Sequence, residues 1–308
     1  TWRVSLLPTR TDSEQLQGIK GSKTSQNLHR SLVFKVSLSP GDGLVQDLSN
    51  CQRDINVLYD TARSWGLEMN MDKCSVIHFG RDLQLGAFAK CARFSIGGRL
   101  IRSDVSSVDL GVTIDSTLRF HDHIATVVRK AGGLATNLLR STLNREASFM
   151  ITLFVSHVRP VIDYCSCLWH TGYTGDLHRL ESVQRRWTRK VSGLEDVDYA
   201  TRLRRLDLYS IKGRLLRTDL IRCWKIFNGK CVISTDQLFS PAQETRTRGH
   251  LYRVGVARST LECRRRSFAV RSVGIWNSLP QDVVSSSSLS TFKSLLHDVL
   301  AGRLFEFV

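Results

Sequence analysis

The chain has 308 residues, of which 42% are hydrophobic, and a net charge of +16 at neutral pH with a pI near 9.9. This length and apolar content allow a globular protein of two domains. No apolar run approaches the roughly 18 residues that a membrane-spanning helix needs. No secretory signal opens the sequence, and its eight cysteines lack paired spacing. We therefore expect free thiols in an intracellular protein, nuclear or cytoplasmic, without a membrane partner.

Residues 1–34 are polar and weakly periodic, and we expect an unrelated or disordered segment there. A helix is predicted next, because apolar residues recur at steps of three and four up to Trp65. Gly66 stands where a left-handed residue ends a helix. A polar turn and a strand that begins after Lys73 should follow. The apolar stripe of this helix comprises Val45, Leu48, Cys51, Ile55, Leu58, Ala62 and Trp65.

Residues 94–115 are predicted to form a strand, a Gly-Gly turn and another strand, which completes a first domain at residues 35–115. Residues 116–230 should be mainly helical, with Asn228 and Gly229 ending the block. Pro160 should kink or split one of these helices, because proline lacks a backbone donor. Residues 231–308 are predicted to be basic and irregular, with a last helix capped by Ser288 or Ser290. The main helices are expected at 121–140, 144–169 and 176–192, followed by two shorter segments.

The predicted helix at 176–192 has two chemically different faces. Leu180, Val183, Trp187, Val191 and Leu194 form an apolar face, and Gly193 is placed to cap the helix. The helix should dock by this face and present four guanidinium groups on its other side, where they can contact phosphates. The alternative is an ordinary surface helix that uses arginine for solubility. The four residues are Arg179, Arg185, Arg186 and Arg189.

Residues 179–272 hold 22 Lys and Arg against 9 Asp and Glu, so most of the excess charge lies in one stretch. Such a surface attracts RNA, DNA or an RNA–DNA hybrid through the phosphate backbone. A solvated basic face or a nuclear-import patch is the simpler alternative. The run Arg264 to Arg266 is either a further backbone contact or a localisation signal. A second candidate set lies on the two shorter helices: Arg202, Arg204, Arg205, Arg214, Arg217, Arg222 and Lys225.

Several of these segments resemble the region after the palm in non-LTR (LINE-type) retrotransposon polymerases of the Jockey and chicken-repeat kind. Gly66, Leu67, Asn70 and Lys73 resemble motif D of the reverse-transcriptase palm. The run DLGV, with Asp109, Leu110 and Gly111, resembles the primer grip. The resemblance extends from about residue 35 to the C-terminus through VRPVIDY at 158–164, LESVQRRWTRKVSGL at 180–194, TRGH at 247–250 and IWNSLPQDVVSSSSLSTFK at 275–293.

The resemblance implies an α+β fold: a palm remnant of one helix and short antiparallel strands, then a helical thumb, then a basic tail. In the family, paired aspartates hold two Mg²⁺ ions about thirty residues before the motif D lysine. This sequence has no Asp-Asp dipeptide, and SLVFKVS at 31–37 occupies that place. Only about 34 residues precede the place, too few for the fingers, and the chain begins at Thr1. We therefore expect a truncated reverse transcriptase with a vestigial Lys73, no cofactor of its own and non-specific nucleic-acid binding.

Two other hypotheses remain open at this point. The chain could be the C-terminal portion of an active RNA-directed DNA polymerase whose upstream exons are missing. It could also be an element-derived product without function, or a module that binds protein partners not identified by the sequence. No metal site is predicted, because Cys165 and Cys167 face apart on a helix and cannot join His170 around zinc. His121 and His123 are expected to be surface histidines.

Overall fold

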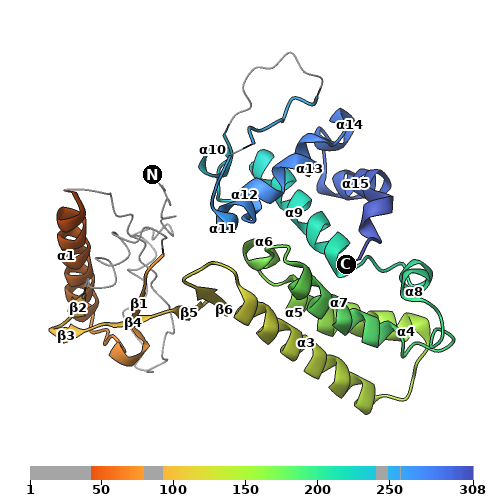
Figure 1. Cartoon of the computed structure of the whole chain (residues 1–308), viewed down its shortest axis with the longest axis horizontal. Helices are drawn as coiled ribbons and strands as arrows, with labels where there is room; N and C mark the ends of the chain where they lie inside the picture. Colours follow the sequence, from red (N-terminus) through yellow and green to blue (C-terminus); the bar gives the residue numbers. More distant parts are fainter. Residues whose placement is uncertain (1–42, 80–92, 241–248, 257, 308) are drawn as a thin grey trace. The chain divides into compact units, whose positions relative to one another are not determined.

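The computed structural model describes residues 43–79, 93–240, 249–256 and 258–307. It combines helices with short strands, which confirms the predicted α+β class. The chain forms two compact units, of which the first ends at Thr117 and the second begins at Leu118. In Figure 1 the first unit carries every strand of the described residues, and the second is helical.

The first unit begins with α1 (Gly43–Ser64), the helix that the apolar stripe predicted. Gly66 ends it with φ +69°. The amide of Gly66 donates to the carbonyl of Arg63 (2.9 Å), and that of Leu67 donates to the carbonyl of Ala62 (2.9 Å). This pair of bonds is the Schellman motif, which satisfies the last carbonyls of a helix. The glycine cap is therefore confirmed, although Trp65 is 63% exposed.

A polar turn and three small sheets follow. The side chain of Asn70 accepts a hydrogen bond from the amide of Asp72 (3.1 Å) and caps η2 (Met71–Lys73). Each sheet has two strands: β1 (Ser75–Ile77) with β4 (Arg102–Asp104), β2 (Ser95–Ile96) with β3 (Arg99–Leu100), and β5 (Ser106–Asp109) with β6 (Val112–Asp115).

The β2–β3 and β5–β6 pairs are antiparallel as predicted, but β1 and β4 run parallel, with Val76 opposite Ser103. The expectation of antiparallel strands was therefore wrong for this pair. The reason is the connection. A tight turn forces its two strands to run antiparallel, whereas a long segment that contains the β2–β3 hairpin separates β1 from β4 and permits either direction.

α1 packs on the β2–β3 hairpin. The side chain of Gln52 donates to the carbonyl of Ser95 (2.8 Å) and accepts from its amide (2.9 Å). Gly97, at φ +55°, lies so close to the Tyr59 ring that a Cβ there would approach it to 2.7 Å. The Gly-Gly turn therefore serves both the hairpin and its contact with the helix.

The second unit begins with α3 (His121–Ser141), a helix that the sequence predicted. The single helix expected at 144–169 is instead broken into four pieces, ending before His170. A π-helical turn precedes Pro160, and a second break falls at Cys165, whose φ is +51°. The π turn is consistent with the missing donor of Pro160, which interrupts the ordinary i→i−4 bonding. The four pieces are α4 (Ala147–Leu153), η3 (Phe154–Val158), α5 (Arg159–Asp163) and α6 (Ser166–Trp169).

The next helix, α7 (Thr174–Thr188), is shorter than expected. Gly193 has φ +74° but lies in the turns beyond the helix, so its predicted role as the cap of this helix was wrong. The amide of Ser192 donates to the carbonyl of Arg145 (2.9 Å), which ties these turns to the segment before α4. Val191 and Leu194 are nevertheless buried, because the turns carry them into the core.

α8 (Tyr199–Arg205) leads to α9 (Ile211–Phe227), which ends before Asn228 and Gly229 as predicted. The side chain of Ser210 caps α9 by accepting from the amide of Gly213 (3.0 Å). A Cβ on Gly213 would lie 2.2 Å from the carbonyl oxygen of Leu304. Only glycine permits this approach of the last helix to α9.

The segment after residue 230 is not an irregular tail. In the described residues it forms α10 (Thr235–Leu238), α11 (Glu262–Arg265), α12 (Phe268–Arg271), α13 (Val273–Asn277), α14 (Gln281–Val284) and α15 (Leu289–Leu304). Ser288, one of the two predicted caps, accepts from the amide of Thr291 (3.0 Å) and begins α15. The last helices share one core with α9, which contains Trp224, Trp276 and Phe292. Most of these helices are one turn long, too short to produce a periodic apolar pattern in the sequence. Their contribution to the fold is therefore seen only in the core that they share with α9.

Candidate nucleic-acid interface

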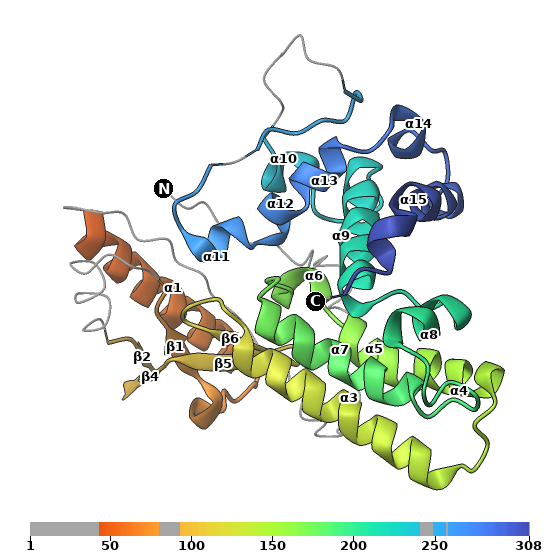
Figure 2. The same cartoon turned by 45° about the vertical axis from the view of Figure 1, so that its right-hand side comes forward.

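A basic groove runs between α3 and α7, which lie side by side (Figure 2). Its volume is about 690 Å³, and it is open to solvent. We call it the α3–α7 groove. It is lined by Gly132, Ala135, Thr136, Leu139, Arg145, Val183, Arg186, Trp187, Arg189, Lys190 and Glu195.

The groove exists because small residues of α3 face large residues of α7. A Cβ on Gly132 would lie 3.6 Å from a guanidinium nitrogen of Arg186, so the helix backbone itself forms one wall. Trp187 is 2% exposed and its indole donates to the carbonyl of Met150 (3.2 Å). This bond fixes the Trp187 side of the groove against α4.

Four cations and one carboxylate, that of Glu195, line the groove. The guanidinium of Arg145 donates to the carbonyls of Leu139 (2.8 Å) and Thr142 (2.7 Å), which holds it at the carboxyl end of α3. Neither Arg189 nor Lys190 forms an ion pair with any described residue. An unpaired, exposed cation is available to an external anion, and several such cations together attract a phosphate backbone.

The four arginines predicted to share one surface of α7 are all exposed, but they have different neighbours. Arg186 and Arg189 line the groove. Arg179 pairs with Asp176 (3.2 Å). Arg185 lies over the rings of Tyr199 (4.8 Å) and Phe307 (5.5 Å). The structure therefore brings two of the four together at the groove.

No residue of the second predicted set lines the groove. Arg204 and Arg205 are exposed on α8. Arg214 makes a bidentate ion pair with Asp163, and Arg217 lies over the Tyr209 ring (5.7 Å). Of the third cluster, Arg265 and Arg266 both pair with Glu262.

Sequence reasoning missed two groove residues, Arg145 and Lys190. Lys190 directly follows Arg189, so its charge was visible, but it lies beyond the helix. Arg145 precedes α4 and carries no periodic signal. Its place in the groove depends on the pairing of α3 with α7, which only the folded chain shows.

The residues that resemble motif D and the primer grip belong to the first unit. Asp109, Leu110 and Gly111 lie at the β5–β6 hairpin, and φ is +44° at Leu110 and +82° at Gly111. Positive φ at both central residues is typical of a tight two-residue hairpin. Lys73 ends η2, and its side chain lies outside the described residues. Residues 31–37 occupy the place of the paired aspartates of the family, and they also lie outside the described residues.

No group of three or more His, Cys, Asp and Glu side chains in the described ranges is placed to hold a metal ion. Within those ranges, no helix combines the length and apolar character needed to cross a membrane. Cys165 is exposed, at the break before α6.

Two histidines expected on the surface are not free surface groups. His123 is buried, and Nδ1 of His121 lies 2.6 Å from the buried carboxylate of Asp176. The expectation was wrong for His123, whereas His121 is 42% exposed and is tied to the start of α7 by this contact. A further buried histidine, His170, lies 3.8 Å from Asp219.

Burial lowers the pKa of His123, His170 and His250 below the ordinary value of 6.5. The unfolded chain therefore binds more protons than the folded chain as the pH falls through this value. We expect the free energy of unfolding to fall between pH 7.5 and pH 5.5, measured by urea denaturation. His250→Gln should weaken this dependence. A free energy that stays constant or rises on acidification would contradict the prediction.

Comparison with known proteins points to one class, the RNA-directed DNA polymerases of mobile elements. The similarity is to the RNA-directed DNA polymerase from mobile element jockey of Drosophila melanogaster, with 21% identity over 159 residues. These residues are 51% of this chain and 17% of the relative, so the chain spans less than a fifth of the relative's length. No family model and no solved structure matches the chain. The similarity supports a distant relationship to non-LTR retrotransposon reverse transcriptases.

Proposed function

We propose that the chain is a C-terminal part of a reverse-transcriptase-related protein and binds RNA, DNA or an RNA–DNA hybrid through the phosphate backbone. The observation that carries the proposal is the α3–α7 groove, where four cations face one carboxylate. Contacts to phosphates position a nucleic acid without reading its bases, so the binding is largely independent of sequence. The helical second unit acts as a thumb in this proposal, and the β5–β6 hairpin corresponds to a primer grip.

We further propose that this chain alone does not polymerise. A polymerase of this class needs carboxylates around two Mg²⁺ ions. The sequence has no Asp-Asp dipeptide, and the described residues contain no cluster that fits a metal. Lys73 is then a vestigial lysine, since an acid that protonates a leaving pyrophosphate requires bound metal and triphosphate beside it.

The binding proposal is tested by the salt dependence of affinity for an RNA–DNA hybrid, measured by fluorescence anisotropy. Each phosphate contact contributes about 0.7 to 0.9 to the log–log slope. Arg186, Arg189 and Lys190 together predict a slope of about −2 to −3. The double variant R186Q/R189Q should bind about tenfold more weakly and lose about 1.5 from the slope.

The control variant K293Q/R303Q removes the same charge from exposed positions on α15. It should keep both the slope and nearly all the affinity. If the two double variants weaken binding equally, the attraction comes from net charge and not from the groove. A slope near zero for the parent chain would show that no set of phosphates is contacted.

The second proposal predicts that the purified chain incorporates no labelled nucleotide on a primed RNA template with Mg²⁺. The physical reason is the missing carboxylate pair. Incorporation that a chelator abolishes would refute the proposal and favour an active polymerase. The Lys73→Ala variant would then show whether that lysine takes part.

A further inference from the structure

A second group of arginines lies where α5 meets α9, apart from the α3–α7 groove. Arg159 and Asp163 are one turn apart on α5, and Arg214 and Arg217 are three residues apart on α9. Nε of Arg214 lies 2.8 Å and 3.1 Å from the two carboxylate oxygens of Asp163. All four side chains are half-buried. Arg214 is paired with this carboxylate, and the guanidinium groups of Arg159 and Arg217 both lie close enough to Arg214 to feel its charge.

Neither Arg159 nor Arg217 forms an ion pair with a described residue, although the charge of Asp163 reaches Arg159. The Nε atoms of Arg159 and Arg217 are buried and donate no hydrogen bond. Their guanidinium groups lie over aromatic rings instead, at 5.9 Å from the centroid of Phe154 and 5.7 Å from that of Tyr209. An aromatic face attracts a cation, but it does not accept a directed hydrogen bond from each N–H as an oxyanion does.

The positive charges disfavour one another. Burial, followed by the neighbouring charge of Arg214, lowers the pKa of Arg159 to about 10. Burial likewise lowers the pKa of Arg217, and Arg214 adds to the effect. Partly desolvated like charges are costly unless an anion compensates them. Asp163 cancels one of the three charges and leaves an excess of two.

We propose that Arg159, Arg214 and Arg217 form a binding site for a dianionic phosphate group. A phosphate monoester carries a charge of about −1.5 to −2 near neutral pH and offers three acceptor oxygens. This matches an excess of two positive charges, whereas a backbone phosphodiester carries only one negative charge. Planar guanidinium groups suit such an oxyanion because each can donate two parallel hydrogen bonds. Free phosphate and the phosphorylated 5′ end of a nucleic acid share this chemistry.

The first arm of the test uses inorganic phosphate and does not depend on the proposed nucleic-acid binding. Thermal unfolding of the full chain is followed with increasing phosphate, with sodium chloride keeping the ionic strength constant. We expect a saturable rise in Tm, because a ligand that binds only the folded state stabilises it. The rise should be lost in R159Q/R217Q and kept in K293Q/R303Q, which removes the same charge from exposed positions on α15. Without phosphate, R159Q/R217Q should melt no lower than the parent, since it relieves crowded charge.

The second arm compares 5′-phosphorylated with 5′-hydroxyl oligonucleotides and rests on the proposed function. A preference of about tenfold for the phosphorylated end, lost in R159Q/R217Q, would identify a nucleic-acid end as the source. Equal affinities with a retained phosphate effect on Tm would identify free phosphate as the ligand. R186Q/R189Q should weaken both oligonucleotides equally, which separates this site from the groove. Absence of saturable stabilisation, or equal stabilisation of R159Q/R217Q, would overturn the proposal.

Discussion

Replacing Trp276 by alanine is expected to lower the free energy of unfolding by about 3–5 kcal/mol, the usual cost of removing a large aromatic side chain from a core. Trp276 is 1% exposed and stacks on Phe227, with 4.9 Å between the ring centroids. Its indole donates to the carbonyl of Tyr252 (2.9 Å), which would lose its partner. The truncation therefore opens a cavity and removes a hydrogen bond from this carbonyl.

Urea denaturation followed by circular dichroism measures this effect, and Trp65→Ala is the matched control. Trp65 is exposed beside the cap of α1, so its removal should change the free energy of unfolding by less than about 1 kcal/mol. A small effect at Trp276 would mean that α13 does not belong to the core of α9. The C-terminal helices would then be a detachable tail.

The Asp219→Asn variant is expected to cost a similar amount, about 3–5 kcal/mol, because it leaves a largely buried guanidinium without its counter-charge. Asp219 is 3% exposed. Arg271 donates to its two oxygens at 2.8 Å and 3.0 Å, and His170 lies beside it. Burial raises the pKa of Asp219, but neighbouring His170 and the charge of Arg271 outweigh burial and lower it. The carboxylate therefore stabilises the fold at neutral pH, and this contribution is lost only in acid.

Arg271 also donates to the carbonyls of Arg266 (2.9 Å) and Cys167 (2.8 Å), so this pair links α6, α9 and α12. Asp104→Asn is the control, because its pair with Arg102 (2.9 Å) is at the surface. A surface pair contributes at most about 1 kcal/mol. If chemical denaturation gives equal losses for the two variants, the buried pair does not hold these helices together.

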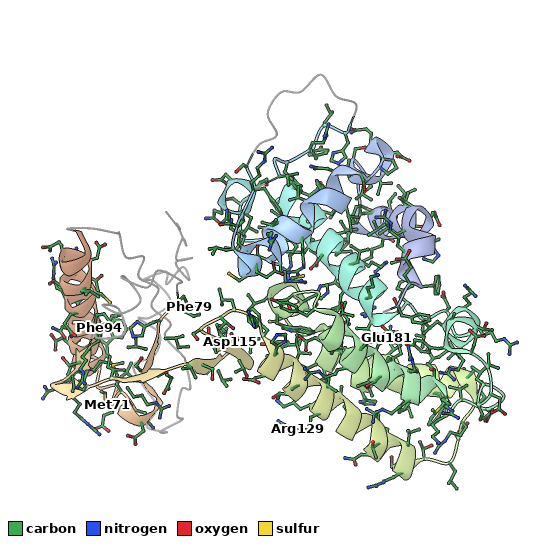
Figure 3. All side chains as sticks on the ribbon, in the orientation of Figure 1. Met71, Phe79, Phe94, Asp115, Arg129 and Glu181 are labelled. Atoms are coloured by element: carbon green, nitrogen blue, oxygen red, sulfur yellow. The ribbon has the colours of Figure 1, made fainter. Side chains whose placement is uncertain are left out.

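A third buried polar contact joins α7 to α9. The carboxylate of Glu181 on α7 (Figure 3) accepts from the amide of Ile211 (2.9 Å) and from the hydroxyl of Tyr199. Burial raises the pKa of Glu181. The helix that carries Arg186 is thus fastened to the start of α9.

The main helices and their ends could be predicted from local signals. The stripe before Gly66, the Asn228-Gly229 end of α9 and the Ser288 cap of α15 were all visible, since periodicity and capping act over a few residues. The basic composition and the motif resemblance were visible too, because both are read directly from the residues of the sequence. The jockey similarity supports that resemblance as a distant relationship.

The pairing of elements was decided by packing between distant residues. Gly132 and Ala135 make room for a groove because α3 lies against α7, about fifty residues later in the chain. The short helices α10, α12, α13 and α14 acquire a role only by joining the core of α9, since a helix of one turn is not stable on its own. The same packing decides which arginines pair with Asp163, Asp176 or Glu262. It also decides which arginines stay available to an external anion. Charge is a property of composition, whereas the availability of a charge depends on its neighbours in space.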